Sequence, residues 1–165
     1  MNETGLSLDI SRQSRSYGIL AAEHVACRTV KGTANVSARI LVVEDQEDVA
    51  QLIDVVLEGE GYTVAIAKDG AQGLMLSREW GPDLILMDIM LPGVDGGTLI
   101  ARLRREPETA GLPIIAMSAS RTLRDRSNEL EADALLPKPF NIDALLVQVQ
   151  FLLDRGRTDE GVTDA

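Results

Sequence analysis

The sequence predicts an α/β protein with a five-stranded parallel sheet covered by helices on both faces. Short apolar runs rich in β-branched residues alternate with longer segments whose apolar residues recur at helical spacing. This strand-helix pair occurs five times in about 115 residues. The apolar runs are nearly continuous, which is typical of strands that are buried on both faces and joined by crossover helices.

Two strand-helix pairs open the regular part of the chain. The first strand is the run RILVV at residues 39–43, and the helix that follows is expected to end at Gly61. A second strand, YTVAIA at 62–67, precedes a helix around 70–80, whose far end carries Trp80, the only tryptophan. The buried face of the first helix is predicted to consist of Val49, Leu52, Ile53, Val56 and Leu57.

The third and fourth pairs have the same layout. DLILM at 83–87 precedes a helix around 95–105, and PIIAMSA at 113–119 precedes a polar helix around 121–131. This polar helix has two strong apolar anchors, whereas the first and last helices each have five. Because each buried aliphatic side chain contributes roughly 1.5–3 kcal/mol, we expect the polar helix to be the most weakly held and to carry a conformational change.

The last pair closes the domain. Its strand lies in ALLPKPF, and its helix begins after Asn141, whose side chain is a suitable N-cap. Gly156 is expected just past the end of this helix. The buried stripe of the helix is predicted to consist of Leu145, Leu146, Val149, Leu152 and Leu153.

Composition divides the chain into three parts. Residues 1–38 mix small polar residues with scattered charges and are expected to be a mostly disordered extension. Residues 39–154 are expected to form the folded domain, and residues 155–165 a short tail. The domain holds 20 acidic and 10 basic side chains, within a net charge of −10 for the chain. Because a nucleic-acid-binding face must be basic to neutralise phosphates, we expect no direct nucleic-acid binding.

Single residues exclude several kinds of site. His24 is the only histidine and Cys27 the only cysteine, so a histidine-based catalytic centre, a cysteine metal cluster and an internal disulfide are not expected. The chain has no apolar run of about 18 residues and no secretory-signal pattern at its start. The sequence therefore predicts a cytoplasmic protein without membrane segments.

The predicted strands end on side chains that can do chemistry. Glu44 and Asp45 come after the first strand, Asp88 after the third, Ser118 near the end of the fourth and Lys138 in the fifth. Ligands of open α/β sheets bind at the carboxyl ends of the strands, so we expect these five side chains to converge. Three neighbouring carboxylates repel one another unless a cation lies among them. Mg²⁺ prefers such hard oxygen ligands, and an aspartate that attacks phosphorus needs a metal and a fixed cation.

Four motifs in this order resemble the response-regulator receiver domain of two-component signalling. They are ILVVEDQEDV, DLILMDIMLPGVDG, IIAMSAS and LLPKPF, and the resemblance covers residues 39 to about 154. It implies a flavodoxin-like, doubly wound sheet with the strand order 2-1-3-4-5. It also implies a bacterial signalling domain that is not an enzyme in the usual sense, with at most self-catalysed phosphotransfer and dephosphorylation.

The resemblance assigns a role to each of the polar residues. Asp88 accepts a phosphoryl group from the phosphohistidine of a partner, Ser118 hydrogen-bonds that group, and Lys138 contacts Asp88 or its phosphoryl group. The peptide bond between Lys138 and Pro139 is expected to be cis. The implied cofactor, Mg²⁺, is held by Glu44, Asp45, Asp88 and the backbone carbonyl of Met90.

Two kinds of departure from the family pattern occur, at three positions. Leu135 stands where many members carry an aromatic residue, so we expect the response to phosphorylation to be a displacement of the loop and helix after Ser118 without a ring rotation. Met90 and Ser120 occupy the positions that tune hydrolysis of the acyl phosphate in this family. Neither is a carboxylate or an amide, so we expect a phosphorylated state that is not especially short-lived.

The implied partners are a sensor histidine kinase or a histidine phosphotransfer protein, and a downstream protein. Only 11 residues follow Asp154, so we expect a stand-alone receiver; a homodimer remains open. A haloacid-dehalogenase-type hydrolase is disfavoured because Met90 replaces its second aspartate. A flavin-binding protein is disfavoured because VEDQEDV would repel a phosphate. The remaining alternative is a degenerate receiver that binds a partner protein independently of phosphorylation.

Overall fold

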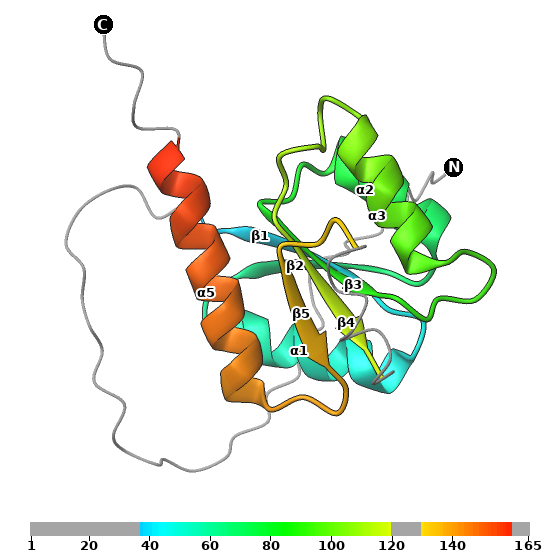
Figure 1. Ribbon diagram of the computed structural model, residues 1–165. Coiled ribbons are helices and arrows are strands. Elements are labelled where there is room, and N and C mark those ends of the chain that lie inside the picture. The colour runs from blue at the N-terminus through cyan, green and yellow to red at the C-terminus, as the bar shows by residue number, and fades with distance from the viewer. Residues whose placement is uncertain (1–36, 120–129, 160–165) are drawn as a thin grey trace, which may run out of the picture. The chain divides into compact units, whose positions relative to one another are not determined.

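A computed structural model describes residues 37–119 and 130–159, all of which belong to one compact unit. Its centre is a parallel sheet in the order β2-β1-β3-β4-β5 with helices on both faces (Figure 1). The predicted fold class and strand order are therefore confirmed. Most of the expected extension and tail lies outside the described residues. The strands are β1 (Arg39–Val43), β2 (Thr63–Ala67), β3 (Leu84–Asp88), β4 (Ile114–Ser118) and β5 (Ala134–Pro137).

Two of the described helices cover each face of the sheet. Figure 1 shows α1 and α5 on one side of the strands and α2 and α3 on the other, as their contacts with the core require. The expected helix at 121–131 falls mostly outside the described residues, and its last two positions, Leu130 and Glu131, are not helical. The helices are α1 (Glu47–Gly59), α2 (Gly70–Glu79), α3 (Gly96–Arg105) and α5 (Ile142–Asp159).

The sheet divides the hydrophobic core into two halves because successive side chains of a strand point to opposite faces. Ile85 of β3 belongs to the half under α2 and α3, whereas its neighbour Leu86 belongs to the half under α1 and α5. Every residue of β3 and β4 is buried. This two-sided burial is the physical reason why the central strands have continuous apolar sequences.

Helix α1 ends in a Schellman motif. The backbone N–H of Gly61 donates to Glu58 O at 3.0 Å, and the N–H of Tyr62 donates to Leu57 O at 3.1 Å. Gly61 has a φ of 89°, a left-handed conformation that glycine adopts without the steric cost of a Cβ. The prediction that the helix ends at Gly61 is thus confirmed, and the left-handed conformation of this glycine is the physical reason.

The buried face of α1 is narrower than predicted. Ile53 and Leu57 are fully buried, together with Ala50, whereas Leu52 is 50% exposed. A helix turns about 100° per residue, so Leu52 is rotated away from Ile53 and out of the stripe that faces the sheet. The prediction that Leu52 lies on the buried face was therefore wrong.

The side chain of Asn141 caps α5, as predicted. Asn141 Oδ1 accepts a hydrogen bond from the N–H of Asp143 at 2.6 Å. The predicted stripe packs on the core. Gly156 does not follow the end of the helix, because α5 continues to Asp159. Gly156 has no positive φ, and an interior glycine weakens a helix by only about 1 kcal/mol relative to alanine.

One arginine joins α3 to the chain that enters β5. Arg104 donates through Nη1 to Leu112 O at 2.6 Å and through Nε to Glu131 O at 2.8 Å. Its Nη2 contacts Asp133 Oδ2 at 2.7 Å. The same carboxylate oxygen accepts a hydrogen bond from the N–H of Ile114 at 2.8 Å. Arg104 therefore fixes the start of β5 against α3 and the start of β4.

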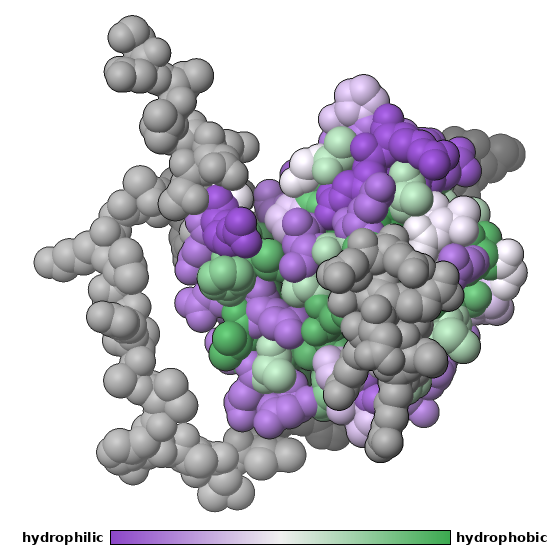
Figure 2. All heavy atoms as spheres, viewed as in Figure 1, coloured by the Kyte–Doolittle hydropathy of each residue, from purple (hydrophilic) through white to green (hydrophobic). Residues whose placement is uncertain are grey.

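Several large apolar side chains are exposed, two of them on α5. Figure 2 shows apolar patches among hydrophilic neighbours over α5, where Val147 and Phe151 are 65% and 59% exposed. The Arg155 guanidinium lies over the Phe151 ring, 5.6 Å from its centroid. None of the described helices combines the length and the apolar composition that crossing a bilayer requires.

Gly96 begins α3 in close contact with the end of β3. A Cβ atom at Gly96 would lie 2.6 Å from Ile89 Cα and 2.7 Å from Asp88 O. Both are backbone atoms, so they could move only if the loop after β3 moved. By contrast, a Cβ at Gly59, the last residue of α1, would have no neighbour within 4 Å.

We predict that Gly96→Ala lowers the free energy of unfolding by about 2–3 kcal/mol, because the added methyl group overpacks a rigid site. The matched control Gly59→Ala should raise it by about 0.5 kcal/mol, because alanine favours the helix. Chemical denaturation of both variants tests the pair. Equal stabilities for the two variants would show that the contact at Gly96 is not tight.

Candidate functional site

The register of β1 and β3 brings two of the predicted site residues together. Val43 lies opposite Met87, and the next residues along the two strands are Glu44 and Asp88. Both are buried, with 0% and 2% of their surfaces exposed. Asp88 is the last residue of β3, so the strand extends one residue further than the apolar run predicted.

The register of β4 and β5 adds two more of the predicted site residues. Ser118, the last residue of β4, is paired with Pro137, and Lys138 follows directly. The N–H of Lys138 donates to Ser118 O at 2.7 Å, and Ser118 is 6% exposed. The Lys138-Pro139 peptide bond is cis, as the family resemblance implied.

The Lys138 ammonium joins two buried carboxylates. Its Nζ lies 2.6 Å from Glu44 Oε2 and 2.7 Å from Asp88 Oδ2. A buried carboxylate is costly unless it is paired and hydrogen-bonded. The remaining oxygens are also engaged, because Asp88 Oδ1 accepts from the N–H of Met90 at 2.8 Å and Glu44 Oε1 accepts from the N–H of Gln46 at 3.3 Å.

Burial and charge act against each other in this cluster. Burial raises the pKa of Glu44 above its usual value of 4.5, and the charge of Asp88 raises it further. The hydrogen bond from Lys138 lowers the pKa of Glu44 but does not cancel the rise. For Lys138 the balance is reversed: burial alone would lower its pKa, but its hydrogen bonds to Asp88 and Glu44 raise it. The ammonium is therefore held in its charged form.

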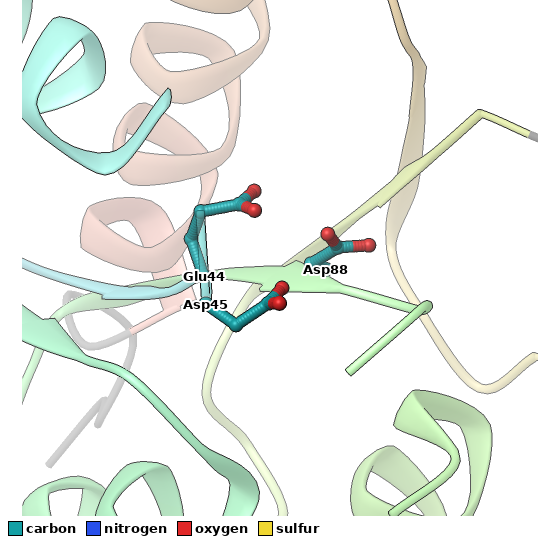
Figure 3. A group of neighbouring side chains, drawn as sticks. All are labelled: Glu44, Asp45 and Asp88. Carbon is teal, nitrogen blue, oxygen red and sulfur yellow. The ribbon is translucent and has the colours of Figure 1, made fainter. Parts of the chain in front are cut away.

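Asp45 completes a group of three carboxylates. Glu44, Asp45 and Asp88 each present an oxygen atom, and these atoms all lie within 4.8 Å of one another. Figure 3 shows the three side chains gathered where β1 and β3 end. Asp45 is exposed, unlike the other two. The cluster thus offers hard oxygen donors that are open to water on one side, which suits Mg²⁺ because this ion retains part of its hydration shell.

Of the three positions that depart from the family pattern, two lie within the described residues. Met90 is 66% exposed, and its backbone N–H contacts Asp88. Leu135 lies in β5 and packs against the core half under α2 and α3. Ser120 lies outside the described residues.

Three contacts were not predicted from the sequence. These are the bond from Lys138 to Glu44, the bond from the Met90 N–H to Asp88, and the close approach of Gly96 to the end of β3. The glycine pair directly after Asp95 was an available signal for the last of these, since glycine commonly marks places where two backbones approach closely. No sequence signal identifies the other two.

Comparison with known proteins assigns the family. The sequence profile of the response regulator receiver domain matches residues 40–150. The chain belongs to this family, whose members act in two-component signalling. The resemblance drawn from the four motifs is therefore confirmed.

Individual relatives agree with this assignment. The DNA-binding dual master transcriptional regulator RpaA of Synechocystis sp. is 40% identical over 119 residues, which cover 71% of this chain and 49% of RpaA. The chain spans about half the length of the curated relatives it matches.

Two solved structures share the fold. A response regulator from Chloroflexus aurantiacus aligns with a TM-score of 0.67 and 33% identity, over 72% of this chain and 98% of that one. The receiver domain of the sensor histidine kinase PA1611 from Pseudomonas aeruginosa aligns with a TM-score of 0.67 and 30% identity, over 72% and 99%. That structure contains a magnesium ion in its active-site cleft.

We predict that Lys138→Met destabilises the protein by about 2–3 kcal/mol at pH 7.5, because two buried carboxylates lose their cation. The loss should be smaller at pH 5. Without Lys138 the pKa of Glu44 in the folded protein rises further. A carboxyl group whose pKa is higher in the folded than in the unfolded protein contributes stability below its unfolded-state pKa, near 4.5. This contribution is lost as the pH rises through its folded-state pKa.

Urea denaturation of wild type and variant between pH 5 and 8 tests this expectation. The control is Lys68→Met, which removes an exposed lysine and should show little change across the same range. A loss for Lys138→Met that is the same at every pH would contradict the role given to Glu44.

Proposed function

We propose that the chain accepts a phosphoryl group on Asp88 in a Mg²⁺-dependent reaction, from the phosphohistidine of a sensor kinase or a histidine phosphotransfer protein. The modification then switches binding to a downstream protein. The observation that carries this proposal is the contact of Lys138 Nζ with Asp88 Oδ2 at 2.7 Å, inside a cluster of three carboxylates.

Each residue has a chemical task in this proposal. Mg²⁺, held by Glu44, Asp45, Asp88 and the Met90 carbonyl, would supply positive charge to the phosphoryl oxygens. Asp88 provides the carboxylate oxygen that forms a bond to phosphorus while the bond from phosphorus to the histidine nitrogen of the partner breaks and that imidazole leaves. Lys138 provides a fixed positive charge as the negative charge spreads over the phosphoryl group. The product is an acyl phosphate, and the hydroxyl of Ser118 then donates a hydrogen bond to one of its oxygens.

The phosphoryl group changes the contacts of Lys138. In the unphosphorylated protein the ammonium bridges Glu44 and Asp88. A dianionic group on Asp88 competes for the same ammonium, so the pairing of Lys138 with Glu44 weakens. The buried Glu44 carboxylate is then left without a cation unless a metal ion takes the place of Lys138 beside it. Phosphorylation and Mg²⁺ binding are thus expected to support each other.

The acidic domain is proposed to act on a protein and to make no direct contact with nucleic acid. RpaA is named as a DNA-binding regulator and is about twice as long as the matched region. In the chain described here, residues 39–154 carry twice as many acidic as basic side chains, which opposes binding to phosphates. The apolar side chains exposed on α5 are available to a protein partner, including a second copy of the chain.

We predict that Asp88 is the sole phosphoacceptor. With Mg²⁺ and acetyl phosphate, the wild-type protein should gain one acid-stable, base-labile phosphoryl group, and Asp88→Asn should gain none. The matched control is Asp95→Asn, seven residues along the chain, because asparagine keeps the helix-capping role of Asp95 at α3. Labelling of Asp88→Asn at the wild-type level would overturn the assignment, and a wild-type chain that is never labelled would favour the phosphorylation-independent alternative.

We predict opposite effects of Asp45→Ala on stability and on metal binding. Removing one of three neighbouring anions should stabilise the metal-free protein slightly, by about 0.5 kcal/mol or less. Mg²⁺ affinity should fall about tenfold or more, because second-shell changes alone typically cost that much. Asp45→Asn removes the same charge while nearly keeping the side-chain shape, so it should change stability and Mg²⁺ affinity in the same directions as Asp45→Ala. Thermal denaturation and Mg²⁺ titration by NMR measure the two effects; unchanged Mg²⁺ affinity would remove Asp45 from the ligand set.

A further inference from the structure

A cavity of about 150 Å³ lies beside the acidic cluster. It is lined by residues of α1, of β2, of the turn that leads into α2 and of α2 itself. Glu44 and Asp45 are shared between this cavity and the acidic cluster. Its other polar lining consists of Glu47, Gln51, Lys68 and Gln72.

Two of the contacts among the polar residues of this cavity are long and exposed. Lys68 Nζ lies 3.8 Å from Glu47 Oε1, and both side chains are about two-thirds exposed. Gln51 Nε2 lies 3.5 Å from the same Glu47 oxygen, and Gln72 Oε1 accepts from the N–H of Lys68 at 2.8 Å. Long, exposed contacts of the first two kinds contribute little to stability. These side chains can therefore turn toward a ligand in the cavity at small cost.

We propose that this cavity holds outer-shell water of the divalent cation bound at the acidic cluster, and that Glu47 and Lys68 set the affinity for that cation with opposite signs. The inference rests on the proposed function, because that function places Mg²⁺ at the cluster. Glu47 and Lys68 are thus positioning residues, which act on the cation through water and charge without direct coordination.

Size and chemistry support this proposal. Mg²⁺ loses its water reluctantly and keeps several water molecules when it is held by few carboxylates. A water molecule occupies roughly 30 Å³ of liquid volume and needs two to four polar partners. The cavity has room for several water molecules, and the Glu47 carboxylate and the Gln51 amide can hydrogen-bond to them.

Charge gives the two residues opposite effects. Glu47 attracts a cation at the cluster, whereas Lys68, the one cationic residue in the described lining of the cavity, repels it. The Glu47–Lys68 pair partly cancels the two fields. If either side chain is removed, the charge of the other therefore acts on the bound cation without this cancellation.

The test is a titration of the whole chain with MgCl₂, followed by NMR at constant ionic strength. Glu47→Gln should weaken Mg²⁺ binding and Lys68→Met should tighten it, each on the order of two- to fivefold for a unit charge acting through solvent. Lys68→Arg should retain the wild-type affinity. Raising the NaCl concentration should shrink all of these differences, because salt screens exposed charges.

The matched control is Asp48→Asn. Asp48 is exposed, is adjacent to Glu47 in the first turn of α1, and does not line the cavity. Its neutralisation should weaken binding by less than half as much as Glu47→Gln does. Equal weakening by the two variants would show that only the general charge of the helix terminus matters, and would overturn the proposal.

The direction in which Lys68→Met changes the Mg²⁺ affinity distinguishes an effect of the Lys68 charge from a structural role of its side chain. If Lys68 only held the turn before α2 in place, its removal would weaken Mg²⁺ binding; unchanged or weaker binding therefore contradicts the proposal. If the wild-type chain binds Mg²⁺ but none of the variants differs from it, the proposed function stands and this inference falls. If the wild-type chain shows no Mg²⁺-dependent shifts at the cluster, both fall.

Discussion

The contact of one ammonium group with two buried carboxylates is the interaction on which the site depends. Glu44 and Lys138 are 94 residues apart, and Asp88 and Lys138 are 50 apart. Only a sheet that places β1, β3, β4 and β5 in the observed order brings these side chains together. The ammonium in turn allows two carboxylates to stay buried at the strand ends, where either one alone would be costly.

This arrangement resolves a conflict between the fold and its chemistry. A parallel sheet covered on both faces stabilises itself by excluding water from its strands, yet the proposed phosphoryl transfer needs charged groups at the same strands. The two requirements meet at the carboxyl edge. There Glu44 and Asp88 are enclosed, and Asp45, one residue further along, is exposed. The cluster therefore has one side packed against protein and another side open to hydrated ions.

Much of the fold was predictable because its signals are local. The strands and the described helices follow from apolar periodicity, and Gly61 marks the end of α1 through its own backbone preference. Glu44, Asp88, Ser118 and Lys138 were identifiable because the ends of parallel strands meet at one edge. Leu52 was misplaced and α5 was cut short, because the width of a buried stripe and the continuation past Gly156 depend on tertiary packing. The bond from Lys138 to Glu44 and the cavity beside Glu47 depend on side-chain positions in three dimensions, which no local pattern encodes.

The bonds made by Arg104 have a mechanical consequence. Just before β5 begins, the chain is bound to α3 through two contacts of Arg104, with Glu131 O and with Asp133 Oδ2. These bonds hold the chain that enters β5 against α3. Because Lys138 follows β5 directly, the place of its ammonium depends on an arginine of α3 as well as on its own strand. The position of the charge at the site is thus shared between two separate elements of the domain.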